Sequence, residues 1–321
     1  MSEPLRQPAI GIADRASTVR ARPSWSAERA VYVGLAVAIT VAVVFGFART
    51  FFFRPWYPEW ARVHGAPETI FYVHGVAYAA WLLLLLAQTS LVTAGRVDIH
   101  RRLGLAGAGL AVVMVVLGVV GSVIAAARPT GFIDIPMPPL QFLVVPFTIL
   151  VLFAVFVTLG ILNRRRPQSH KRYMILASIA LIEAGIGRWP FAFMTAPSPV
   201  PGLGMIELCV DLFLVPMIVW DLVSRGRPHP VTLWGGAALI ANQLLRMPLA
   251  RTDAWLAFTG WAVSLVPPRR RQPLVPGREL MTCWALRRGA LERAGEETGR
   301  QFARAPYQSV PQHPAGASST S

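Results

Sequence analysis

The sequence has few charged residues, only one lysine and only two cysteines. Charged residues make up 15% of the 321 positions, against about a quarter in a typical soluble domain. Cys209 and Cys283 provide neither a disulfide framework nor the spacing of a zinc site. These absences argue against a soluble domain with one water-covered core, and against a small domain held together by disulfides or zinc.

Nearly all of the positive charge comes from arginine. The formal net charge is +15, and Lys171 is the single lysine. The arginines lie beside apolar runs or near the two ends of the chain, a distribution typical of the cytoplasmic loops of membrane proteins. Net charge bears on association and not on fold, and here the positions of the arginines indicate membrane topology. We therefore predict no nucleic-acid partner and expect contact with a lipid bilayer.

Long apolar runs, most of them without a charged residue, dominate the middle of the chain. A hydrocarbon layer roughly 30 Å thick needs about 20 apolar residues of helix. Seven runs reach or approach this length, at residues 30–48, 70–94, 103–127, 140–162, 173–189, 205–223 and 230–245. We predict an all-α, polytopic transmembrane helix bundle of about seven spans, with residues 254–266 as either a short eighth span or an interfacial helix.

The charged segments at the two ends delimit the predicted membrane domain, residues 30–266. Residues 1–29 form a polar, basic leader, and residues 267–321 form a basic tail, rich in Pro, Ser and Gly, that we predict to be largely disordered. A cytoplasmic amino terminus places most helix-flanking arginines on the cytoplasmic side, as the positive-inside rule requires. We therefore predict a multi-pass protein of the cell inner membrane, and leave the side of the tail open.

Several ionisable residues fall inside the predicted spans, where they usually face the bundle interior or a cavity. Glu207 and Asp211 are four positions apart and share a helix face, so they need a cation nearby or a shared proton. A ligand or proton site in the outer half of the membrane is the hypothesis, formed by His74, Glu183, Arg188, Glu207 and Asp211, with Arg246 as a further cation. The alternative is a purely structural network that ties the fifth, sixth and seventh helices together.

Two histidines precede predicted helices at the cytoplasmic side, each followed by a basic residue and an arginine. His100 and His170 are 70 positions apart in similar short segments. A pair of histidines on neighbouring helices is what an axially ligated b-type haem needs, so haem binding and electron transfer form an alternative function. The other alternative is that both histidines only position interfacial loops, and that the chain is a structural or assembly protein.

A combination of short motifs resembles a group of uncharacterised bacterial multi-pass membrane proteins. The motifs are Tyr72-Val73-His74-Gly75 with Trp81, His100-Arg101-Arg102-Leu103-Gly104, His170-Lys171-Arg172-Tyr173-Met174, Arg188-Trp189-Pro190, and Arg227-Pro228-His229-Pro230 with Trp234-Gly235-Gly236. The resemblance covers residues 30–261 and implies seven or eight helices in the inner membrane, without an activity. A weaker likeness is to cytochrome b561-type proteins, which need a histidine pair on each side of the membrane, whereas the outer side here offers only His74 and His64.

No local motif indicates an enzyme. The sequence has no phosphate-binding glycine loop, no metal-ligand spacing and no nucleophile motif. It therefore favours a non-enzymatic role, with a transporter or small-ligand membrane protein as the leading function.

Overall fold

The computed structural model describes residues 25–64, 67–133 and 135–267. Every regular element within these ranges is a helix. Most of the predicted leader and nearly all of the predicted tail, with Cys283, lie outside the described residues. The first helix, α1, already begins at Trp25, so the end of the predicted leader is helical.

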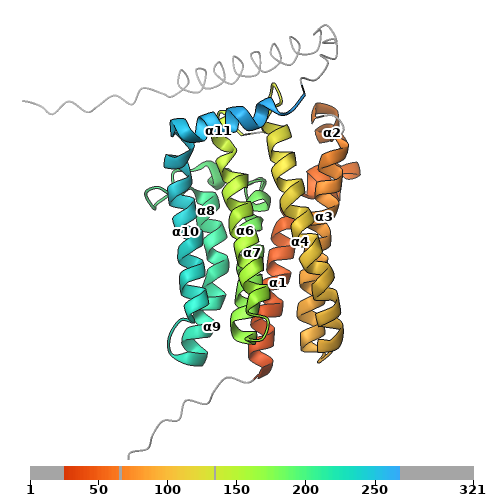
Figure 1. Cartoon of the computed structure of the whole chain (residues 1–321), viewed down its shortest axis with the longest axis vertical. Coiled ribbons are helices and arrows are strands. Elements are labelled where there is room, and N and C mark those ends of the chain that lie inside the picture. Colours follow the sequence, from red (N-terminus) through yellow and green to blue (C-terminus); the bar gives the residue numbers. More distant parts are fainter. Residues whose placement is uncertain (1–24, 65–66, 134, 268–321) are drawn as a thin grey trace, which may run out of the picture. The chain divides into compact units, whose positions relative to one another are not determined.

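Long helices lie side by side and form a bundle (Figure 1). The long helices are α1 (Trp25–Gly46), α3 (Thr69–Thr93), α4 (Val97–Ala126), α6 (Val144–Leu162), α7 (Pro167–Ile186) and α10 (Pro230–Ala250). The shorter elements are η1 (Ala48–Phe52), η2 (Arg54–Trp56), α2 (Pro58–His64), α5 (Pro139–Phe142), η3 (Ala192–Thr195), α8 (Met205–Asp211), η4 (Leu212–Leu214), α9 (Val215–Arg225) and α11 (Asp253–Ser264).

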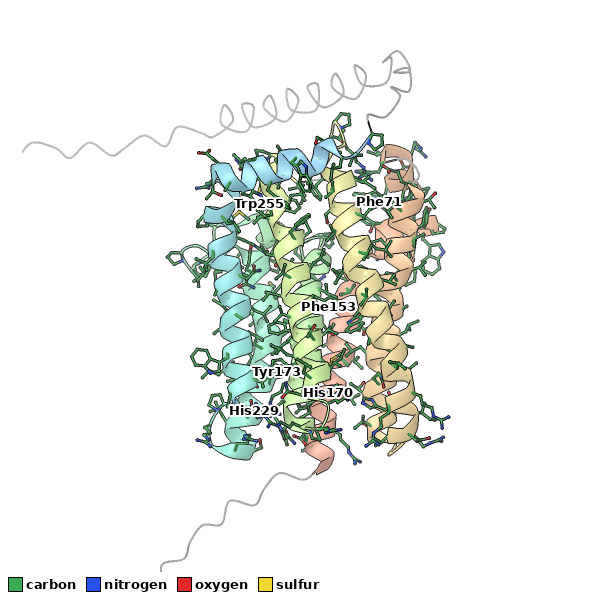
Figure 2. The ribbon with its side chains drawn as sticks, in the orientation of Figure 1. Phe71, Phe153, His170, Tyr173, His229 and Trp255 are labelled. Atoms are coloured by element: carbon green, nitrogen blue, oxygen red, sulfur yellow. The ribbon has the colours of Figure 1, made fainter. Side chains whose placement is uncertain are left out.

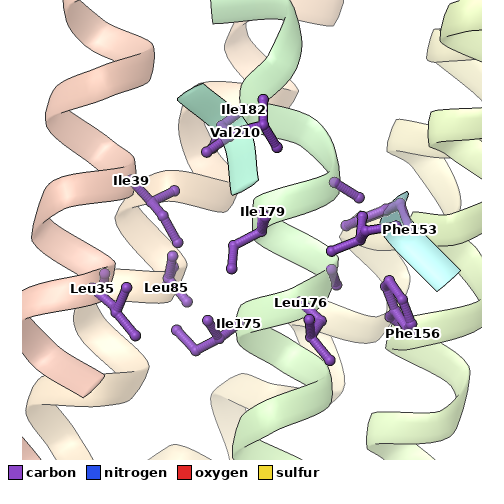
Figure 3. Close-up of a cluster of buried hydrophobic side chains, with 14 of the residues drawn as sticks. Leu35, Ile39, Leu85, Phe153, Phe156, Ile175, Leu176, Ile179, Ile182 and Val210 are labelled. Carbon is purple, nitrogen blue, oxygen red and sulfur yellow. The ribbon is translucent and has the colours of Figure 1, made fainter. Parts of the chain in front are cut away.

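Helix α7 is the centre of the bundle. It packs against α1, α6, α8 and α10, while α3 and α4 form a neighbouring antiparallel pair that contacts α1 and α6. Most of α7 between Ile175 and Ile186 is buried. The core around it is aliphatic and aromatic (Figure 3) and includes the fully buried Ile39, Phe153 and Ile179. The polar side chains of α7 in this stretch, Ser178 and Glu183, are therefore surrounded by protein.

Four segments are long and apolar enough to cross a membrane, judged by length and composition: Ala27–Gly46, Thr69–Thr93, Val97–Ala126 and Pro139–Leu162. Large apolar side chains cover the outside of these helices; Leu105 is 79% exposed and Val112 is 65% exposed. A continuous apolar surface of this kind is unfavourable in water and favourable in the hydrocarbon core of a bilayer. The chain is a membrane protein with several helical spans and contacts the lipid bilayer.

The predicted spans at 173–189, 205–223 and 230–245 do not meet this test. α7 carries three charged residues, and α10 contains Asn242, Gln243 and Arg246, which lower its mean hydropathy. The predicted span 205–223 is divided into α8, η4 and α9. Pro216 lacks the N–H that would bond the carbonyl of Leu212, which explains the change of helix type there.

Other helix boundaries also differ from the prediction. α4 begins at Val97 and α7 at Pro167, so His100 and His170 lie in the first turns of these helices and not before them. Proline is well suited to the first position of a helix. The predicted helix 140–162 is interrupted at Leu143, because Pro146 cannot donate to the carbonyl of Phe142.

Helix α11 runs across one end of the bundle and not along it (Figure 1). It packs against α5 and the nearby end of α4, and Trp255 Nε1 donates to the Leu140 carbonyl at 3.0 Å. Trp255, Phe258 and Trp261 form a row of aromatic contacts along it. Helix α11 is therefore not parallel to the long helices, and its place in the membrane interface stays a prediction.

Candidate functional site

Arg246 on α10 joins two carboxylates from two other helices. Its Nη1 donates to Glu183 Oε2 at 2.8 Å, and its Nη2 lies 2.7 Å from Glu183 Oε1, which makes a bidentate pair with α7. Nη2 also bonds Glu207 on α8. Arg246 is 2% exposed and Glu183 is 9% exposed. This ion triad connects three helices within about one turn of the end at which α7 finishes.

Asp211 lies beside this triad, at the point where α8 gives way to η4. Gln243 Nε2 donates to Asp211 Oδ1 at 3.1 Å. Gln243 is one turn before Arg246 on α10, so both side chains emerge from one face of that helix. We call Glu183, Glu207, Asp211, Gln243 and Arg246 the acidic cluster.

One buried acceptor of the acidic cluster has no hydrogen-bond partner. Gln243 is 4% exposed, and because its amide nitrogen is committed to Asp211, its Oε1 is left without a donor. A cavity of about 10 Å³ adjoins this residue, which is about the space of one water molecule. The lining residues are Ile149, Leu152, Ala180, Glu183, Val210, Leu239, Asn242 and Gln243. A buried acceptor at such a cavity calls for a small donor or cation.

The structure brings together three of the five residues predicted for the ligand or proton site, Glu183, Glu207 and Asp211. Arg246, the further cation named from the sequence, is the centre of the group. Arg188 instead bonds the Ala184 carbonyl and lies over the Phe47 ring, 4.5 Å from its centroid.

His74 is on α3, away from the acidic cluster. Its ring stacks on Tyr78 with centroids 4.1 Å apart, and its Nδ1 is buried without a hydrogen-bond partner. Tyr78 donates to the Met114 carbonyl at 3.1 Å, and Trp81 donates to Ser178 at 3.2 Å. This face of α3 therefore makes interhelical hydrogen bonds to α4 and α7.

A second buried network lies at the opposite end of the bundle, where α7 begins. Arg172 pairs with Asp221, and both side chains are 0% exposed. Asp221 Oδ2 also accepts from the Thr232 hydroxyl at 2.6 Å and from the backbone N–H of His229 at 3.0 Å. Lys171 pairs with Glu28 on α1. Figure 2 places His229 and His170 at this end, which we call the basic end because Arg164, Arg165 and Arg166 form its loop between α6 and α7.

The sequence analysis missed the role of Asp221. One signal was present: an acidic side chain near the carboxyl end of a helix faces the negative end of the helix dipole. Such a residue needs a cation or hydrogen-bond donors from elsewhere, and Arg172, Thr232 and His229 provide them. Burial also lowers the pKa of His229, as do the nearby charges of Arg172 and Arg225, to about 4.

The two histidines predicted as a pair do meet at the basic end. The His100 and His170 rings are 6.1 Å apart between centroids and nearly perpendicular. His170 Nδ1 lies 2.8 Å from the Gly160 carbonyl oxygen. His100 Nδ1 is buried without a hydrogen-bond partner. At the other end, the ring against His74 belongs to a tyrosine, so His74 is not paired with another histidine in the part of the chain that the structure describes.

Among the described residues, no group of three or more His, Cys, Asp or Glu side chains is arranged to hold a metal ion. No protein-family model, no curated protein and no solved structure matches the chain. The resemblance to uncharacterised multi-pass membrane proteins therefore stays a prediction, and the site rests on its geometry alone.

Proposed function

We propose that the chain is a seven-span protein of the bacterial inner membrane with a cytoplasmic amino terminus. The spans beyond the four apolar ones are α7, the α8–α9 segment and α10. A charged side chain within a span raises the free-energy cost of inserting the helix into the bilayer, and this cost is smaller when the charge is paired inside the bundle. Arg172 pairs with Asp221, and Glu183 and Glu207 pair with Arg246, so polar contacts within the bundle compensate the cost that a simple hydropathy test assigns to these helices.

The bundle works, in this proposal, as a transporter or small-ligand protein for a proton or a monovalent inorganic cation, with the acidic cluster as its site. When all three carboxylates of the acidic cluster are ionised, their negative charge exceeds the single positive charge of Arg246 by two. A buried excess of negative charge is costly unless a proton or cation compensates it. The cavity admits nothing much larger than water.

The unpartnered Gln243 Oε1 is the observation that carries this proposal. Buried acceptors in a purely structural network are normally hydrogen-bonded. In the acidic cluster, an acceptor without a partner lies beside a carboxylate and a small cavity. The interruption between α8 and α9 supports the same assignment, because discontinuous helices recur at the ion sites of transporters. His74 and Arg188 lie outside the acidic cluster, so neither is a ligand in this proposal.

Flux measurements on the full chain in liposomes test the proposal. An internal pH-sensitive dye reports proton entry under an imposed pH gradient. In separate runs with external Na⁺ or K⁺, an internal dye that is sensitive to that ion reports its entry. Asp211→Asn keeps a hydrogen-bond acceptor for Gln243 but removes the charge, so we expect the flux to fall at least about tenfold with an unchanged melting temperature. Glu59→Gln, at an exposed ion pair with Arg62, is the control and keeps the wild-type flux.

Two outcomes distinguish the proposal from a structural network. If Asp211→Asn folds normally and carries the wild-type flux, the cluster is not the transport site. If the wild-type protein carries no flux of any of the three ions, the assembly or structural alternative takes its place.

A further inference from the structure

Each histidine of the pair at the basic end has one ring nitrogen that makes no hydrogen bond: Nδ1 of His100 has no partner, and only Nδ1 of His170 is bonded. The Gly160 carbonyl can only accept, so His170 Nδ1 carries the proton and its Nε2 has the lone pair. His100 Nδ1 is buried and has no hydrogen-bond partner. Backbone carbonyls that hold the outer nitrogen are how proteins orient metal-binding histidines.

The separation of the rings agrees with a single ion between them. Transition metals bind imidazole nitrogen at about 2.0 Å, so two imidazoles on opposite sides of one ion have centroids roughly 6 Å apart. The observed distance is 6.1 Å. An ion at this place would also be the missing partner of the buried His100 Nδ1.

The surroundings select the kind of ion. Only two nitrogen ligands are present, and Zn²⁺ in a structural site requires four. Arg101 and Lys171 adjoin the two histidines in sequence, so a singly charged ion is repelled less than a divalent one. Met174, one helical turn after His170, has its sulfur close to Gly160. Imidazole and thioether together suit copper(I).

A haem fits the same spacing less well. A porphyrin needs a wide cleft between the two rings, and an empty cleft of that size would leave the nitrogen that faces it accessible to solvent. His100 Nδ1 has essentially no accessible surface. We propose that His100 and His170 bind one copper(I) ion between them, at a site separate from the acidic cluster.

Copper(I) titration of the detergent-purified full chain tests this proposal. The titration runs under reducing, anaerobic conditions with a chromophoric copper(I) chelator as the competitor. We expect one copper per chain. Loss of a partner that merely orients a ligand lowers metal affinity about 10- to 100-fold, so His100→Ala and His170→Ala should each lower it at least that much. His64→Ala, on the exposed α2, is the matched control and retains the wild-type affinity.

X-ray absorption at the copper edge of the wild-type protein keeps the test independent of variant folding. It should show nitrogen neighbours at about 2 Å with the outer-shell pattern of imidazole. The proposal is overturned if the wild-type chain competes for copper(I) no better than a variant that carries both His100→Ala and His170→Ala. An intense Soret band in the purified protein that His170→Ala removes overturns it as well, in favour of haem.

Discussion

Each charged side chain within α7 meets an opposite charge from another helix. Lys171 pairs with Glu28, Arg172 with Asp221, and Glu183 with Arg246. Removing one partner of a buried pair leaves an uncompensated charge, which is far more costly than the pair itself is stabilising. The pairs therefore specify which helices surround α7 more than they add to its stability.

His229 connects this electrostatic arrangement to pH. Its backbone N–H donates to Asp221, and its Nδ1 accepts from the N–H of Val231 at 3.1 Å, which caps α10. Burial, together with the charges of Arg172 and Arg225, lowers the pKa of His229 to about 4, whereas an unperturbed histidine has a pKa of about 6.5. The unfolded chain therefore takes up this proton before the folded chain does.

We expect the free energy of unfolding to decrease as the pH is lowered from about 6.5 to about 4. This residue contributes up to about 1.4 kcal/mol per pH unit to the decrease. The contribution is fully present above pH 6.5. His229→Asn keeps a good capping residue and has no titratable ring, so its melting temperature should depend less on pH in this window. Melting curves in detergent from pH 7.5 to 4.5 measure the difference; identical slopes for both proteins would contradict the assignment.

At the scale of elements, α1 and α7 approach so closely that glycine is required at their contact. A Cβ at Gly46 would lie 2.0 Å from the Gly185 carbonyl oxygen, and a Cβ at Gly185 would lie 3.0 Å from the Val43 Cα. Trp189 Nε1 donates to the Ala42 carbonyl at 3.1 Å beside this contact. Small residues that allow such approach are typical of helix interfaces in membranes.

Gly46→Ala should therefore destabilise the bundle, because two backbones must separate. We expect a loss of about 1–3 kcal/mol, as for other overpacked positions. Gly34→Ala is the matched control: it lies on the same helix, and nothing is within 4 Å of its added Cβ, so better helix propensity should leave stability unchanged or raise it by up to about 1 kcal/mol. Thermal unfolding in detergent compares the two. Equal effects would mean that the α1–α7 contact does not depend on Gly46.

Local patterns predicted the element boundaries only in part. Apolar runs located α1, α3, α4 and α6 well, because lipid-facing helices must be apolar along their length. The early starts of α4 and α7 were missed, because polar and basic first turns resemble loops in a hydropathy pattern. Pro146 and Pro216 were available as signals of the breaks at α5–α6 and η4.

At the scale of the whole molecule, the proposed seven-span arrangement makes the two ends of α7 accessible from opposite sides of the membrane. Arg165 is exposed before α7, and Val200 is exposed after it. In a background without Cys209 and Cys283, we expect Arg165→Cys to react with a membrane-impermeant thiol reagent only from the cytoplasmic side. Val200→Cys should react only from the other side.

Labelling of intact cells and of inverted vesicles measures this sidedness. Reaction of both cysteines from the same side would show that α7 does not span, and the seven-span proposal would fail with it. The four apolar helices would be unaffected by that outcome.

The sequence by itself determined that this is a helical membrane protein, because the length of an apolar run is a local property that can be read directly along the chain. It also identified the ionisable residues of the candidate site, since charge within an apolar run stands out in one dimension. Only the tertiary structure decided which of them meet. Arg246 reaches Glu183 from 63 positions away, and Asp221 reaches Arg172 across 49; such pairings depend on how helices pack, and no local pattern encodes that.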